Sequence, residues 1–117
     1  MSRILILAAL VALLAGAARA DFQRVTAESA FRGLVQGRDL VRFGIRLRVL
    51  PDGRIAGSGF GRDVTGSWEW AEGLFCRTLD WGSGGEPRDC QVVLRDGDTL
   101  RFIADRGRGD RADLRLR

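Results

Sequence analysis

The sequence predicts a mainly β protein: a small antiparallel meander barrel or sandwich of seven or eight strands, with one short N-terminal helix and one disulfide. Alternating apolar and charged residues between Ile45 and Val49 are typical of a strand with one buried and one wet face. Turn signals recur about every 8 to 12 residues, as in small barrels and sandwiches. Two cysteines provide one covalent link.

A helix is expected over residues 27–36. Thr26 can cap its first turn, and Gly37 is a plausible stop. Phe31, Leu34 and Val35 recur at helical spacing, which predicts an apolar face against the sheet. We expect this face to plug the core or to cover an open end of the sheet.

The rest of the chain alternates between short strands and turns. Pro51-Asp52-Gly53 is a strong turn signal, and Gly57 and Gly59 on one strand face indicate sharp bending or close backbone approach. Residues 82–87 and 105–111 are expected to be loops. The strands are expected at residues 45–49, 54–60, 64–70, 74–81, 90–95, 99–104 and 112–117.

Residues 1–20 have the pattern of a cleaved signal peptide. An apolar run from Ile4 to Leu14 ends in small residues, and Ala18-Arg19-Ala20 fits the small-x-small cleavage rule. The alternative, a membrane anchor, needs roughly 20 apolar residues, and this run is shorter. No cysteine follows the run as a lipid anchor would require. We therefore expect cleavage after Ala20, a periplasmic location, and one small β domain over residues 21–117.

Cys76 and Cys90 are expected to form a structural disulfide in an oxidising compartment. The bridge would close a loop of about 15 residues, worth roughly 3 kcal/mol. The alternatives are a metal site and a redox pair. Zinc would need His or more Cys, and a thioredoxin-like pair would have Cys-x-x-Cys spacing.

The composition narrows the possible chemistry. Residues 21–117 carry 17 Arg against 15 acids and no Lys, His or Tyr, so their net charge is only +2. Nucleic-acid binding would need a more clustered positive field. Without His or Lys, catalysis would rest on carboxylate pairs such as Asp80 with Asp89 or Glu69 with Glu72. This inventory favours a protein with no catalytic residues, no cofactor and no metal.

The stretch from Gly66 to Val93 (GSWEWAEGLFCRTLDWG…DCQVV), together with the tail FIADRGRGDRADLRL, resembles a group of small exported alphaproteobacterial proteins of unknown function. Some of them carry an automated label of dihydrodipicolinate reductase. That activity would imply a two-domain dinucleotide-binding enzyme with His and Lys in its substrate motif, and this chain has neither residue. A second, weaker resemblance is to periplasmic metalloprotease inhibitors, which are disulfide-linked β-barrels.

The three tryptophans, Trp68, Trp70 and Trp81, are candidate walls of a ligand pocket. The alternative is that they pack the core or a barrel end, because large aromatic side chains supply much of the burial in a small domain.

A charge cluster near the C-terminus is a candidate binding site for an anionic ligand. It consists of Asp105, Arg106, Arg108 and Asp110, with the adjacent Arg111. The alternative is a solvated loop with weak surface pairing.

A basic stripe is a third candidate, for anionic lipid or polysaccharide. It would be formed by Arg42, Arg46, Arg48 and Arg54. The alternative is a solvated outer face whose positive charge is partly neutralised by nearby acidic residues.

These observations lead to a ranked functional hypothesis. The first reading is a monomeric, non-catalytic binding or interaction module for an envelope protein or small ligand. The second is an envelope-associated structural or stress accessory with at most peripheral membrane contact. The third, and the weakest, is the reductase.

Overall fold

A computed structural model describes residues 21–117; the expected signal peptide, residues 1–20, lies outside the described residues. The elements follow the order β1 Gln23–Val25, α1 Glu28–Val35, β2 Leu40–Arg42, β3 Ile45–Val49, β4 Arg54–Gly59, β5 Arg62–Ala71, β6 Leu74–Asp80, β7 Gly85–Asp96, β8 Thr99–Ile103, α2 Ala104–Gly107 and β9 Arg111–Leu116. Neither helix of residues 21–117 is long enough and apolar enough to span a bilayer.

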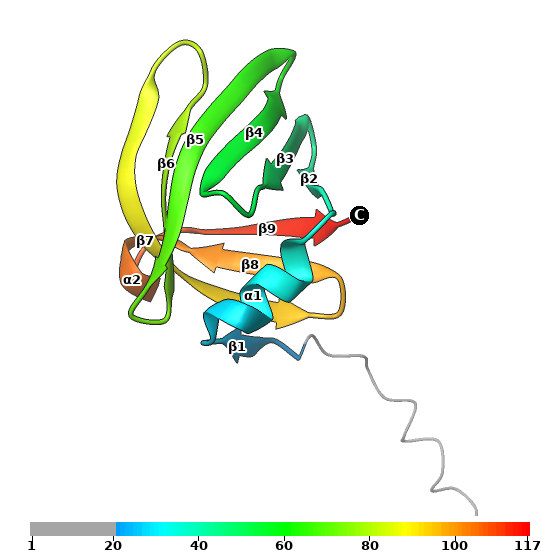
Figure 1. The fold of residues 1–117 in the computed structure, drawn as a ribbon, viewed down its shortest axis with the longest axis vertical. Helices are drawn as coiled ribbons and strands as arrows, with labels where there is room; N and C mark the ends of the chain where they lie inside the picture. Colours follow the sequence, from blue (N-terminus) through cyan, green and yellow to red (C-terminus); the bar gives the residue numbers. More distant parts are fainter. Residues whose placement is uncertain (1–20) are drawn as a thin grey trace, which may run out of the picture.

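The strands form a closed antiparallel barrel (Figure 1). From β2 to β9 each strand pairs with the next one in the sequence, and β9 pairs back with β2. β1 is a ninth strand, which pairs with the part of β7 that β6 leaves free, at Val93–Arg95. The predicted meander barrel is confirmed, whereas β1 and the three-residue β2 were not among the predicted strands.

Helix α1 lies across one end of the barrel (Figure 1). Its Phe31 is fully buried and packs against Trp68, Trp70 and Phe75, with ring centroids 4.9 to 5.6 Å apart. The predicted apolar face is therefore confirmed. The predicted cap at Thr26 is wrong, because the helix begins at Glu28 and its capping residue, Ala27, makes no side-chain hydrogen bond.

Two predicted loops differ from the structure. The segment 105–111 begins within α2, a single helical turn in which Asp105 and Arg106 adopt positive φ angles. The loop 82–87 is shorter than expected, because β7 already begins at Gly85. Pro87 is tolerated in this strand because it lies in a β-bulge, where no ladder hydrogen bond is needed from its nitrogen.

Candidate functional site

The barrel interior is filled at the helix end and hollow at the other end. A cavity of about 320 Å³ lies inside the barrel, a size at the lower end of the range for small-molecule sites. Helix α1 contributes none of its lining, and the exposed lining residues Arg42, Glu86, Asp110 and Arg111 place its mouth at the end opposite α1. Its apolar walls are formed by Leu40, Ile45, Leu47, Val49, Ile55, Phe75, Leu79, Trp81, Phe102, Ala104, Ala112 and Leu114.

The hollow follows from where bulky side chains fall on the inward strand faces. Phe31, Trp68, Phe75 and Phe102 are buried at or near the helix end. Towards the other end β4 has Gly59, which adds no side chain to the interior, and Trp81 is the large side chain there; its ring lies against the β4 backbone, since a Cβ at Gly59 would be 2.5 Å from a Trp81 ring carbon.

The polar side chains of the cavity are few and sit mainly towards its mouth. They are Arg42, Arg77, Glu86, Gln91, Asp110 and Arg111. Arg77 and Glu86 form an ion pair at 2.9 Å, and the Trp81 indole N–H donates to the other Glu86 oxygen at 2.8 Å. Gln91 is buried and donates to Asp89 at 2.8 Å. Apolar walls with a small number of fixed polar groups are the usual composition of a ligand site.

The bulge in β7 explains why Glu86 reaches Arg77. Leu79 pairs with Glu86, but Arg77 pairs with Asp89, so two residues of β7 oppose Thr78 alone. One extra residue reverses the inward–outward alternation. Both Glu86 and Asp89 therefore lie opposite inward-facing residues of β6.

The three tryptophans take different places. Trp68 and Trp70 pack at the helix end, where their indole N–H groups donate to the Leu50 and Thr26 carbonyls at 2.8 and 3.2 Å. Arg32 of α1 stacks 4.7 Å above the Trp68 ring. Of the three, Trp81 lines the cavity, whereas Trp68 and Trp70 belong to the core at the helix end.

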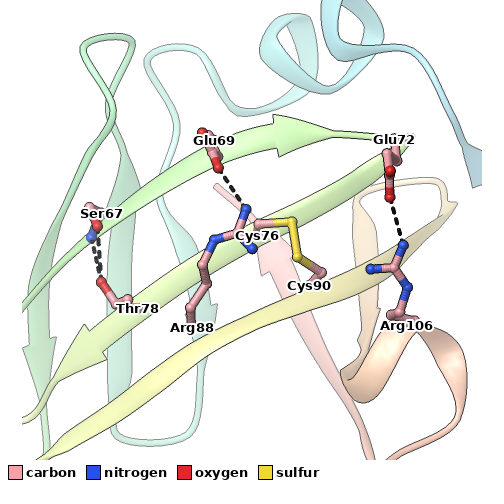
Figure 2. Close-up of polar contacts among 8 residues, drawn as sticks. All are labelled: Ser67, Glu69, Glu72, Cys76, Thr78, Arg88, Cys90 and Arg106. Atoms are coloured by element: carbon pink, nitrogen blue, oxygen red, sulfur yellow. Dashed lines mark hydrogen bonds and ion pairs between the residues drawn. A yellow bond between two sulfur atoms is a disulfide. The ribbon is translucent and has the colours of Figure 1, made fainter.

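The charge cluster of residues 105–110 is also divided. Arg106 pairs with Glu72 at 2.7 Å (Figure 2), and Arg108 lies 3.4 Å from Asp105 on the surface. The Asp105 backbone N–H donates to Asp89 at 2.9 Å, which ties α2 to β7. Asp110 alone of the four lines the cavity.

The predicted basic stripe is not continuous. Arg46 and Arg48 both pair with Asp39, and Arg54 pairs with Asp52 at 2.7 Å. These contacts hold the pKa values of both Asp carboxyls below their usual range, because the Arg side chains donate hydrogen bonds to the ionised form. Arg42 lines the cavity instead.

The acidic pairs considered for catalysis have separate partners. Glu69 contacts Arg88 at 2.6 Å, and Glu72 contacts Arg106 (Figure 2). Asp80 accepts from the Gly82 N–H at 2.8 Å. In residues 21–117, no three His, Cys, Asp or Glu side chains gather as a protein metal site would require.

The predicted disulfide between Cys76 and Cys90 is confirmed. It joins directly paired residues of β6 and β7 (Figure 2). Both side chains point away from the barrel interior, into a second apolar cluster with Leu74 and Val92. α2 covers this cluster closely, because a Cβ at Gly107 would lie 2.9 Å from a Val92 methyl carbon. The disulfide therefore links β6 and β7 on the outside of the barrel, and neither cysteine lines the cavity.

The sequence did not identify Arg77, Glu86 or Gln91 as site residues. Strand alternation places Arg77 and Gln91 inward, next to Phe75 and Val93, and that signal was available.

Comparison of the chain with protein-family models, with curated proteins and with solved structures finds no match.

Proposed function

We propose that this protein is a non-catalytic binding module that holds a small, largely apolar molecule inside its barrel. The observation that carries the proposal is the hollow of about 320 Å³ at the end opposite α1. A barrel whose only task was structural would gain stability by filling such a volume, because interiors normally pack densely and voids are costly. The periplasmic location expected from the sequence is part of this proposal.

The walls support an apolar ligand held by contact and oriented by a few polar groups. Leu47 and Leu114 come from strands β3 and β9, and Phe75 closes the floor towards the helix end. Burying apolar area gains roughly 25 cal/mol per Å². The net affinity is this gain less the freedom that the ligand loses on binding, so it is determined by measurement and not by area.

The test is a fluorescence titration with N-phenyl-1-naphthylamine, a neutral apolar probe that brightens in a dry site. Ala112→Phe adds a ring to a cavity-lining position and should weaken binding at least about tenfold. Ala56→Phe is the matched control, since Ala56 neighbours the inward Ile55 on β4 and points outward. Equal affinities for the two variants, or no binding by the unmodified protein, would refute the proposal.

A second candidate function is peripheral contact between the cavity mouth and an anionic membrane surface. Phe43 and Phe60 are 91% and 68% exposed, on turns that the Phe60 N–H to Gly44 carbonyl bond (2.8 Å) holds together. Aromatic side chains of this kind insert at bilayer interfaces. Arg42 and Arg62 flank the turns, and neither forms an ion pair within residues 21–117.

Sedimentation with vesicles of phosphatidylglycerol and phosphatidylcholine tests this second function. Replacing both rings (Phe43→Ser with Phe60→Ser) should lower the vesicle partition coefficient about tenfold or more, because each buried ring contributes roughly 1.5–3 kcal/mol. Phe22→Ser is the control, since Phe22 precedes β1 at the helix end and its ring lies under Arg101. If the unmodified protein stays in the supernatant at low salt, the second function is rejected.

A further inference from the structure

We infer that the ligand of the cavity carries an anionic head group, recognised by Arg77 and flanked by Arg42 and Arg111. This inference rests on the proposed function and adds the chemical class: an amphiphile with an apolar body and one carboxylate or similar anion. The charged residues that line the cavity are three arginines, Arg42, Arg77 and Arg111, and two acids, Glu86 and Asp110.

Arg77 is the innermost of these charges. It lies on β6 between the inward-facing Phe75 and Leu79, and its side chain is only 13% exposed. A guanidinium carries five N–H groups. Within residues 21–117, its only hydrogen-bond partner is Glu86, through Nη2 at 2.9 Å. Most of its donors are therefore available to a bound molecule.

Glu86 accepts only one hydrogen bond from the Arg77 guanidinium. One of its oxygens accepts from Arg77, and the other accepts from the Trp81 indole at 2.8 Å. Its side chain is 44% exposed, so water screens its charge more than that of Arg77. Glu86 thus orients the guanidinium of Arg77, a cavity-lining residue whose remaining N–H groups have no partner within residues 21–117.

The mouth adds further positive charge. Arg42 and Arg111 line the exposed edge of the cavity and form no ion pair among the described residues, although both lie near enough to Asp113 for their charges to help lower its pKa. Asp113 lies between Ala112 and Leu114, which line the cavity, so it faces outward, and it is already bound by Arg101 at 2.8 Å. Asp110 is the one other acid in the lining. Among the lining residues an entering anion meets three guanidinium groups and two carboxylates, and Asp89, opposite Arg77, already accepts from Gln91 and the Asp105 N–H. Guanidinium groups bind carboxylates through paired N–H···O bonds.

Competition against N-phenyl-1-naphthylamine tests the inference with ligands that differ only in their head group. Decanoate, decan-1-ol and decylamine each have ten carbon atoms in one unbranched chain. We expect decanoate to displace the probe at a concentration about tenfold lower than decan-1-ol, because a charge-assisted hydrogen bond replaces a neutral one. Decylamine should be the weakest of the three.

Two substitutions should move this preference in opposite directions. Arg77→Met keeps the apolar stem and removes the donors, so decanoate and decan-1-ol should become equal within about twofold. Glu86→Gln removes a competing charge but keeps an acceptor for Trp81, so the preference for decanoate should increase. Arg88→Met is the matched control: it breaks the comparable Arg88–Glu69 pair on the outer face (Figure 2) and should change nothing.

The outcomes separate the inference from the function on which it rests. If the probe binds but decanoate and decan-1-ol compete equally in the unmodified protein, the anionic head group is refuted and the binding function stands. A preference for decylamine also overturns the inference. If the probe does not bind, the binding function itself fails. Should Arg77→Met fold poorly by near-ultraviolet circular dichroism, the rise expected for Glu86→Gln still decides the matter.

Discussion

Single glycines shape the barrel by letting backbones approach closely. A Cβ at Gly57 would lie 2.1 Å from the Arg46 carbonyl oxygen, and one at Gly66 would lie 2.1 Å from the Thr78 carbonyl oxygen. Both contacts are with a paired neighbouring strand, so no side-chain rotation could relieve them. The close approach that the sequence predicted for this part of the chain is confirmed at Gly57.

Gly57→Ala should therefore be strongly destabilising. The added methyl forces β3 and β4 apart, and we expect a loss of about 3 kcal/mol or more in the free energy of unfolding. Gly33→Ala is the control within α1, where a Cβ would meet nothing within 4 Å. It should raise stability by roughly 0.5–1 kcal/mol, because alanine favours the helix. Urea denaturation measures both, and similar values for the two variants would contradict this account.

The sequence predicts inward residues well wherever a strand is regular. Alternation on β3 and β9 correctly places Leu47 and Leu114 in the interior. Glu86 was missed because the sequence places it in a loop, residues 82–87, whereas it lies in β7, beyond a bulge at Pro87 and Arg88 that shifts the alternation by one residue. A bulge depends on how two strands fit together, and the sequence of one strand does not reveal it.

At the scale of elements, Asp39 links three parts of the barrel wall. Its carboxylate binds Arg46 and Arg48 of β3, and its backbone exchanges two hydrogen bonds with Arg117 after β9. Its side chain is 19% exposed. This residue therefore helps to hold the short β2 between its two neighbours and so to close the barrel.

Removing this carboxylate should give a pH-dependent loss of stability. The Arg46 and Arg48 hydrogen bonds lower the native pKa of Asp39 below the usual 3.8. Ionised Asp39 therefore stabilises the native state above pH 3.8, and the contribution is lost as the pH falls through the native pKa. Asp39→Asn should cost about 0.5–1 kcal/mol at pH 7, and this difference should shrink in acid.

The control for Asp39→Asn is Asp98→Asn. Asp98 is 60% exposed and pairs with Arg38 at 3.2 Å, so its loss should change stability by less than about 0.5 kcal/mol. Thermal unfolding between pH 2.5 and 7 compares the two. A deficit for Asp39→Asn that is constant over this range would show that the carboxylate charge is not responsible.

Short elements were the hardest to predict from the sequence. β1 and β2 have three residues each, too few for alternation to show. Val25 and Leu40 are nevertheless buried, and β2 completes the ring of strands. Such segments become strands because a neighbour offers a free edge, which is a property of the assembled sheet.

At the scale of the whole molecule, the two ends of the barrel differ. The helix end is sealed by α1, with Phe31 against Trp68 and Trp70. The opposite end holds the cavity, Trp81 and the exposed Phe43 and Phe60. The sequence predicted a helix that covers a barrel end, but it could not show a hollow at the other. That volume depends on how the closed barrel distributes large and small side chains between its ends.

The most direct test of the central claim is to locate the probe by the methyl NMR shifts of the folded protein. Saturating N-phenyl-1-naphthylamine should shift the methyl signals of cavity residues such as Ile45, Leu47 and Leu114. It should leave Leu74 and Val92, beside the disulfide on the outside of the barrel, unchanged. Shifts confined to the outer cluster, or no shifts at all, would contradict a ligand-binding interior.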